Sequence, residues 1–302
     1  MTAREPCPVC GTADLRPSFT LPGLSVRRCP DCRHRVATHA PPADAHADYH
    51  RQYEQGAFLE ALRVTRLRQA ERLVGAIRRQ VSSPGAILDF GAGRGFFLEV
   101  CRREGLAPLA GADTSELAVQ DLRRAGIEAH LLAEEDDPAA RLAKTLSFAP
   151  RVLVLLDVVE HLPPERLFAF LETLPRAFGG GLELLVLKVP VADGLLYGAA
   201  RLAAAVGVPG PLRQLYQVGT WPPHRSYFTV RSLTSLLGRL GYDIAERLDD
   251  LDFEPELLPG RVLRTPSGAG PLLRLAGRAL GAAARASGRF DTTLFLARPG
   301  PL

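Results

Sequence analysis

The chain has 302 residues, of which 46% are hydrophobic and 23% are charged, and its formal net charge is +4. This composition is ordinary for a globular protein and provides enough apolar residues for a sizeable core. Such a mildly basic balance gives no argument for a nucleic-acid partner, and no run of about 18 apolar residues is available for a membrane span. The N-terminal residues lack the apolar core of a signal peptide, so we expect a cytoplasmic protein.

The first expected unit carries four of the five cysteines, spaced as two CxxC pairs. Each pair places two thiolates on one tight turn, and two such turns supply the closed tetrahedral ligand set typical of structural zinc. Disulfides or a redox-active CxxC are the alternatives. We expect residues 1–40 to form a zinc ribbon whose metal is held by Cys7, Cys10, Cys29 and Cys32. Four thiolates leave no open position for substrate, so this unit is expected to be separate from any cofactor site.

The rest of the chain alternates between short apolar runs and amphipathic segments. Residues 41–85 are expected to form a linker and an amphipathic helix, and residues 86–302 a larger domain. The expected strands of this domain are 86–90, 106–113, 127–132, 151–156, 182–189, 242–248 and 292–297. Helices are expected to end at residue 103 and to span 115–125, 164–178, 231–240 and 272–286. This alternation predicts an α/β fold with a Rossmann-like, seven-stranded, mostly parallel sheet and helices on both faces.

Two segments interrupt the alternation. Residues 190–224 follow the fifth strand and contain an apolar helix over 195–206 and proline-rich turns, and residues 249–266 form a loop rich in Asp, Glu and Pro. Segments inserted at the carboxyl ends of parallel strands usually build the substrate side of a site. We therefore expect 190–224 to be a lid over an apolar substrate, with a membrane-surface or partner helix as the alternative.

A glycine-rich turn follows the first strand of the larger domain, with Gly91, Gly93 and Gly95 at every second position. Glycines permit close backbone approach to a ligand. Asp89, just before the turn, can accept a bond from an ammonium group, and Asp113, at the end of the next strand, can accept bonds from both hydroxyls of a ribose. The spacing differs from the Gly-x-Gly-x-x-Gly that seats a pyrophosphate, which favours a cofactor without phosphates.

Residues 86–116 resemble motif I and the following acidic position of class I S-adenosylmethionine-dependent methyltransferases. Asp157-Val158-Val159-Glu160-His161-Leu162 resembles the motif after their fourth strand, and 292–297 their reversed seventh strand. The resemblance covers roughly residues 50–298. It implies S-adenosylmethionine as cofactor, held by Asp89, Gly91, Gly93, Gly95, Asp113 and Asp157.

Some bacterial methyltransferases of sugar and natural-product pathways pair a CxxC…CxxC ribbon with this domain and carry a Tyr-bearing segment, here residues 49–53. Deoxysugar C-methyltransferases are similar in this respect. His224 resembles the histidine of their Glu-His-x-x-Phe-Phe segment, which implies that it takes the substrate's proton, although Pro223 replaces the glutamate. His161 is the second candidate base, and Tyr216 and Tyr227 flank His224.

A metal-assisted mechanism is the alternative for the same residues. Asp157, Glu160, His161 and His224 could hold a divalent ion that chelates a vicinal diol. Small-RNA 2′-O-methyltransferases and quinone-pathway O-methyltransferases resemble this chain in their Glu-x-x-Glu-His segment.

The sequence thus predicts a methyltransferase of a small molecule, a sugar or natural-product intermediate, at oxygen or carbon. RNA methylation and a non-catalytic binding module are the rivals. The modest charge of the chain and the lack of clustered aromatic and basic residues in 1–40 argue against nucleic acid. The oligomeric state has no signal in the sequence.

Overall fold

The computed structural model describes residues 6–12, 14–40, 56–132, 137–179, 181–261 and 268–300. The predicted linker and the Tyr-bearing segment over 49–53 lie outside these residues.

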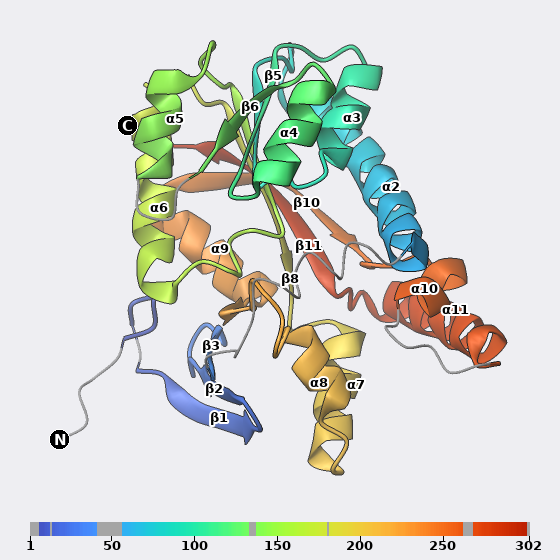
Figure 1. Cartoon of the computed structure of the whole chain (residues 1–302). Coiled ribbons are helices and arrows are strands. Elements are labelled where there is room, and N and C mark those ends of the chain that lie inside the picture. Colours follow the sequence, from blue (N-terminus) through green and yellow to red (C-terminus); the bar gives the residue numbers. More distant parts are fainter. Residues whose placement is uncertain are drawn as a thin grey trace.

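The N-terminal unit is a small antiparallel sheet (Figure 1). Its strands, in the order β1-β2-β3-β9, are β1 (Arg16–Leu21), β2 (Leu24–Arg28), β3 (Arg35–His39) and β9 (Ser226–Tyr227). The first two join in a tight turn in which Gly23 has a φ of 77°, a conformation that favours glycine. The fourth strand comes from a distant part of the chain, so the ribbon sheet is completed by the larger domain.

The larger sheet has the predicted seven strands in the order β10-β11-β8-β7-β4-β5-β6. They are β4 (Ile87–Phe90), β5 (Leu109–Asp113), β6 (Glu128–Leu131), β7 (Val152–Leu156), β8 (Leu184–Pro190), β10 (Tyr242–Asp250) and β11 (Thr292–Pro299). Strand β11 runs antiparallel to both of its neighbours, β10 and β8, whereas the other neighbouring pairs in this sheet are parallel. The central strands read as continuous apolar runs because both faces are buried: in β7, Leu153 and Leu155 enter one core cluster and Val152 and Val154 the other.

Helices cover both faces of this sheet, as predicted (Figure 1). One face packs against α2 (Gly56–Gln80), α3 (Phe96–Arg103) and α4 (Glu116–Arg124), and the other against α5 (Pro138–Thr145), α6 (Pro164–Ala177) and α9 (Val230–Arg239). Helix α5 was not predicted. The start of α9 is fixed by a capping box in which Thr229 and Ser232 bond each other's backbone N–H.

The remaining helices lie at one end of the sheet. They are α7 (Leu195–Ala205), α8 (Gly210–Leu215), the 3₁₀ turn η1 (Pro255–Leu257), α10 (Leu258–Arg261) and α11 (Gly270–Ser287). The segment predicted as a loop after β10 therefore contains two short helical pieces. Among the described helices, none has both the length and the apolar character needed to cross a membrane.

Candidate active site

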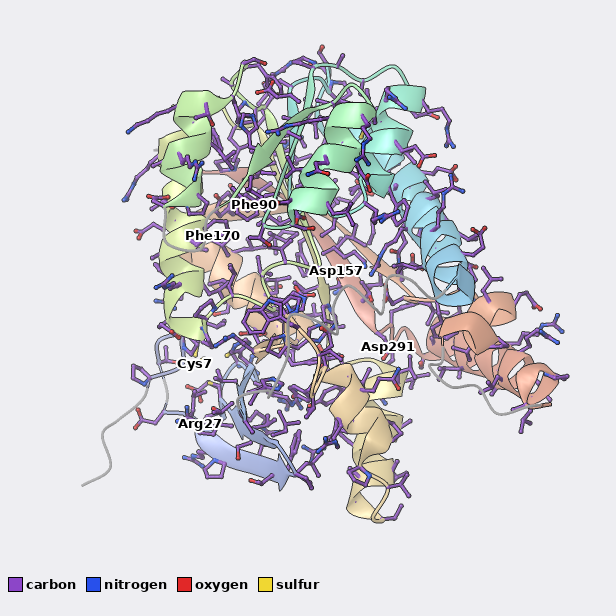
Figure 2. The ribbon with its side chains drawn as sticks, viewed as in Figure 1. Cys7, Arg27, Phe90, Asp157, Phe170 and Asp291 are labelled. Atoms are coloured by element: carbon purple, nitrogen blue, oxygen red, sulfur yellow. The ribbon has the colours of Figure 1, made fainter. Side chains whose placement is uncertain are left out.

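A cavity of about 2260 Å³ lies at the carboxyl ends of β4, β5, β7 and β8. Parallel strands present their terminal loops at one edge of a sheet, which is where such folds bind ligands. Helices α7 and α8 contribute to the opposite wall, so the inserted segment does border the cavity. In Figure 2, Asp157 and Asp291 lie between the sheet and these helices, and both line the cavity.

The glycine-rich turn forms one end of the cavity. Gly91, Gly93 and Gly95 have φ values of 78°, 50° and 74°, which side-chain-bearing residues rarely adopt. A Cβ atom on Gly91 would lie 2.4 Å from Val158, and one on Gly95 would lie 2.6 Å from Leu122. Nothing lies within 4 Å of the equivalent position on Gly93, so the backbone faces open space there.

Two carboxylates flank this turn. Asp113 is anchored by the loop itself, since its Oδ2 accepts from the Gly93 N–H (2.8 Å) and its Oδ1 from the Ser115 N–H (2.8 Å). Asp89 is 2% exposed, and its Oδ1 has no hydrogen-bond partner among the described residues. Burial, with a smaller contribution from the charge of Asp113, raises the pKa of Asp89 to about 8. A buried carboxyl in this state is ready for a cationic partner.

Asp157 directly follows β7 with a φ of 57° and belongs to a network of four charged groups. The ammonium of Lys188 donates to both Asp157 oxygens (2.9 and 2.7 Å) and to Asp252 (3.1 Å). Arg66 pairs with the same two carboxylates, at 2.7 and 2.6 Å. Because two cations already hold Asp157, its role as a cofactor ligand stays a prediction. Sequence reasoning missed Lys188, Arg66 and Asp252.

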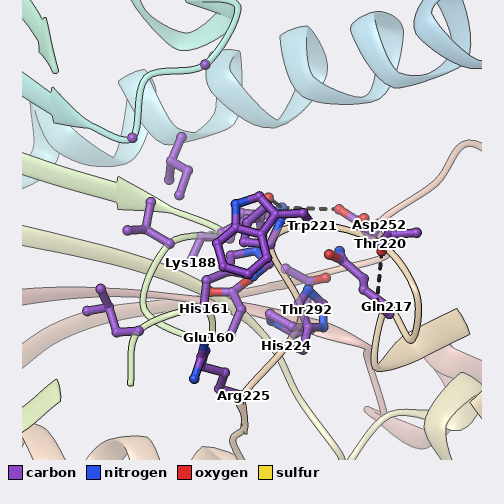
Figure 3. Close-up of a pocket in the computed structure, with 18 of the residues that line it drawn as sticks. Glu160, His161, Lys188, Gln217, Thr220, Trp221, His224, Arg225, Asp252 and Thr292 are labelled. Atoms are coloured by element: carbon purple, nitrogen blue, oxygen red, sulfur yellow. Dashed lines mark hydrogen bonds and ion pairs between the residues drawn. The ribbon is translucent and has the colours of Figure 1, made fainter. Parts of the chain in front are cut away.

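Glu160, His161 and His224 converge beside this network, although His224 is distant in sequence (Figure 3). One potential ligand atom from each lies within 4.8 Å of the others. Glu160 is fully buried and neither of its oxygens has a hydrogen-bond partner among the described residues. Burial, and then the charge of Asp157, raises the pKa of Glu160 well above its usual value.

The two imidazoles lie together in a buried environment that favours their neutral form. Their centroids are 4.8 Å apart. His161 Nδ1 donates to the Pro223 carbonyl at 3.0 Å, which leaves its Nε2 as an acceptor. Burial lowers the pKa of both rings, and the neighbouring His161 lowers the pKa of His224 further because two protonated rings would repel each other. Both rings can therefore accept a proton or bind a metal at neutral pH.

Tyr216 and Tyr227 take different places around His224. Tyr227 lines the cavity, with its ring centroid 5.9 Å from that of His224. Tyr216 is fully buried and its hydroxyl bonds that of Tyr197 at 2.9 Å. Tyr216 therefore acts as packing between the ribbon and the inserted helices.

The four predicted zinc ligands form one buried cluster. Sγ atoms are 3.6 Å apart for Cys7 and Cys32 and for Cys10 and Cys29, and all four lie within 4.8 Å of one another. Such a set matches a tetrahedral zinc–thiolate site, and no disulfide joins them. Cys7 marks the position of this cluster in Figure 2.

We predict that the purified protein contains one zinc per chain, because a buried set of four thiolates matches the ligands of structural zinc. Elemental analysis checks this directly. A value below half an equivalent, in protein prepared without chelator, would contradict the assignment.

The ribbon packs directly behind the segment that carries His224, whereas its separation from the cofactor turn stays a prediction. Strand β3 pairs with β9, and the Ala37 N–H donates to the Arg225 carbonyl at 2.8 Å. His39 Nε2 donates to the carbonyl of His224 itself, at 2.8 Å. From the other side, the Glu160 carbonyl accepts from the N–H groups of Arg225 (2.8 Å) and Ser226 (2.9 Å). The segment carrying His224 is thus fixed between the ribbon and the loop after β7.

The cysteine cluster also shares its hydrophobic core with α9. Thr229, which caps this helix, donates its hydroxyl to the Cys32 carbonyl at 3.0 Å, and the Arg239 guanidinium donates to the Val9 carbonyl. The cysteine cluster, α9 and the His224 segment therefore form one packed unit.

Comparisons with known proteins agree with this architecture. Residues 62–247, more than half of the chain, match the model of a family described as a methyltransferase domain. A search of the curated proteins gives no match.

Solved structures of several methyltransferases are similar in fold. A SAM-dependent methyltransferase from Archaeoglobus fulgidus is 19% identical, over 76% of this chain and 94% of its own, with a TM-score of 0.45. Magnesium protoporphyrin IX methyltransferase from Synechocystis PCC 6803, solved with bound SAH, is 15% identical over 80% and 86%, with a TM-score of 0.48. A small RNA methyltransferase is 16% identical over 78% of this chain and 25% of its own, with a TM-score of 0.49. At these identities the similarity concerns the fold alone.

Proposed function

This chain belongs to the methyltransferase-domain family, and from that premise we propose that it transfers a methyl group from S-adenosylmethionine to an oxygen or carbon of a small molecule. The family expected from residues 86–116 and 157–162 is thereby confirmed. One observation carries the proposal: the glycine-rich turn with its two carboxylates and the Glu160–His161–His224 group line the same cavity. A cofactor site and a proton acceptor are the two parts that methyl transfer needs.

The residues at the turn fit the cofactor. The buried, unpartnered Asp89 oxygen suits an amino-acid ammonium, because pairing with a cation offsets the cost of ionising a buried carboxyl. The open space at Gly93 allows the backbone to approach the ligand closely. Asp113 keeps further lone pairs after its two backbone bonds, and these can accept from ribose hydroxyls. When bound, S-adenosylmethionine supplies the electrophilic methyl group.

On the substrate side, His224 is the proposed base. Burial favours the neutral form of its ring, which lies against His161, and His39 fixes its backbone. The wall opposite combines apolar side chains from α7 with the amides of Gln214 and Gln217. Such a wall suits an uncharged or partly apolar acceptor with a few polar groups.

Replacing Asp113 by alanine tests the cofactor half. We expect the binding free energy of S-adenosylhomocysteine, measured by calorimetric titration, to weaken by about 2–3 kcal/mol. This is the usual cost of removing a charged group that accepts hydrogen bonds from buried hydroxyls. Glu116→Ala, which removes a neighbouring carboxylate that also lines the cavity, serves as the control and should bind nearly as the wild type does. An unchanged dissociation constant for the Asp113 variant would remove this residue from the site.

A second candidate is a metal-assisted reaction, favoured by the convergence of Glu160, His161 and His224. Two neutral imidazoles and one carboxylate are ligands that a divalent ion accepts, and pairing with it would satisfy the two orphaned oxygens of Glu160. Asp157 is not part of this group, because Lys188 and Arg66 hold it. The ion would orient a diol and lower the pKa of its hydroxyls.

Titration with Mn²⁺, followed by electron paramagnetic resonance, separates the two candidates. A metal site predicts one bound Mn²⁺ per chain beyond the zinc, loss of this binding in Glu160→Gln, and activity abolished by EDTA and restored by magnesium or manganese. Glu165→Gln is the matched control, because Glu165 lines the cavity outside the group. Activity that survives EDTA, together with no bound Mn²⁺, would exclude the metal-assisted reaction and favour His224 as a base.

A further inference from the structure

The most exposed large hydrophobic side chains gather on two segments. Nine such side chains occur among the described residues, and four of them are only 37–45% exposed. The other five are 55–73% exposed and come from the end of α7, the turn after it and the start of α11: Leu202, Val206, Val208, Leu272 and Leu275. In Figure 1, α7 extends downward below the sheet and α11 extends to the right beside α10, and both lie away from α3 and α4. We call these five residues together the apolar patch, which has one part at the end of α7 and one part on α11.

The same segments contain no acidic residue. The chain has 33 Asp and Glu residues, yet 194–223 and 268–290 have none and carry six arginines between them. On α11, Arg274 and Arg285 have no ion-pair partner among the described residues, and both are exposed. Arg278 of the same helix pairs with Glu256 at 2.6 Å, which leaves an excess of arginines beside the apolar side chains. Apolar side chains beside such an excess match a surface that is both apolar and negatively charged. A second copy of the chain would bring like charges together at this place.

The apolar patch borders the cavity. Helix α7 lines the cavity with Ala199 and Ala203, while Leu202 and Val206 point outward from the same helix. On the other side, Leu258 of α10 lines the cavity, and α10 packs against α11. A surface held against α7 and α11 would therefore lie next to the substrate side of the cavity.

We propose that the apolar patch docks the enzyme on an anionic lipid surface, and that the methyl acceptor is an amphiphile drawn from that surface. Shallow insertion of Leu and Val side chains, with arginines at the headgroups, gives reversible binding without a membrane span. The part that concerns the acceptor rests on the proposed function, whereas the docking itself does not.

Co-sedimentation with lipid vesicles tests the docking. The wild type should bind vesicles of phosphatidylcholine containing about 30% phosphatidylglycerol, bind pure phosphatidylcholine vesicles at least ~10-fold less well, and be released by added salt. The double variants Leu202→Ser/Val206→Ser and Leu272→Ser/Leu275→Ser should each weaken binding by about 10-fold, because each removes two inserted side chains. Leu131→Ser, on the far strand β6, is the control and should bind as the wild type does.

Equal binding to neutral and anionic vesicles, or none to either, would overturn the proposal. A concentration-dependent dimer that the same double variants abolish would reassign the patch to a second copy of the chain. S-adenosylhomocysteine affinity is measured without vesicles, so failure of the proposed function would appear there independently of the lipid result. Retained affinity in the double variants also shows that they are folded.

Discussion

Replacing His224 by alanine is expected to lower methyl-transfer turnover by ~10²–10⁴-fold, the usual contribution of a positioned general base. Its Nδ1 is buried without a hydrogen-bond partner among the described residues, and the ring lies beside His161 at the substrate side of the cavity. The cofactor turn is formed by other residues, so S-adenosylhomocysteine affinity should stay within a few-fold of the wild type. Release of S-adenosylhomocysteine in the presence of an acceptor measures the turnover.

The pH profile distinguishes a base from a structural residue. Burial and the neighbouring His161 lower the pKa of His224 well below 6.5, while a hydrogen bond to the backbone of Leu215 raises it, His39 lowers it and Asp252 raises it. A base works in its unprotonated form, so the wild-type rate should be flat around neutral pH and fall only below this lowered pKa. The alanine variant should lack that acidic limb. His130→Ala is the control, since His130 pairs with Glu128 on β6, and a wild-type profile in His224→Ala would contradict the assignment.

Replacing Cys29 by serine is expected to disturb the active site as well as the ribbon. Loss of one thiolate should release the zinc and lower the free energy of unfolding by about 4–5 kcal/mol or more, because metal loss is among the mechanisms of the largest single-substitution effects. The cysteine cluster and α9 share one core, and β3 holds the segment that carries His224. We therefore expect turnover to fall, while the cofactor turn, which the ribbon does not contact, keeps its affinity for S-adenosylhomocysteine.

Hydrogen–deuterium exchange localises this effect. The amides of Arg225 and Ser226, which bond the Glu160 carbonyl, should exchange faster in the zinc-free variant, and the Gly93 amide, which bonds Asp113, should not. Cys101→Ala, a buried cysteine outside the cluster, is the control and should retain zinc. Unchanged exchange across 224–229 in zinc-free protein would show that the ribbon does not support the site.

Local patterns in the sequence predicted most of the fold. The apolar runs of β4, β7 and β8 were visible because parallel strands are buried on both faces. The Gly-x-Gly-x-Gly turn was visible because its backbone conformation requires glycine. The short helix α5 was missed, and so was β9, whose two residues are too few to show a period.

The missed parts of the site depend on contacts between distant segments. Lys188 lies in an apolar strand, and a buried charge needs a partner of opposite charge. Its position in the sequence therefore indicates a buried ion pair. Its partners Asp157 and Asp252, and Arg66 beside them, come from β7, the loop after β10 and α2, an arrangement that no local pattern encodes. The bond from His39 to His224 likewise joins residues 185 positions apart.

The most direct test of the central claim is methyl transfer itself. The enzyme is incubated with S-adenosylmethionine carrying an isotopically labelled methyl group, in parallel with a small-metabolite extract and with an RNA pool, and the products are analysed by mass spectrometry. We predict a small-molecule product that gains one labelled methyl group and that is absent when His224→Ala replaces the wild type. Label on RNA alone would contradict the account. So would the absence of any labelled product from both pools, together with no binding of S-adenosylhomocysteine.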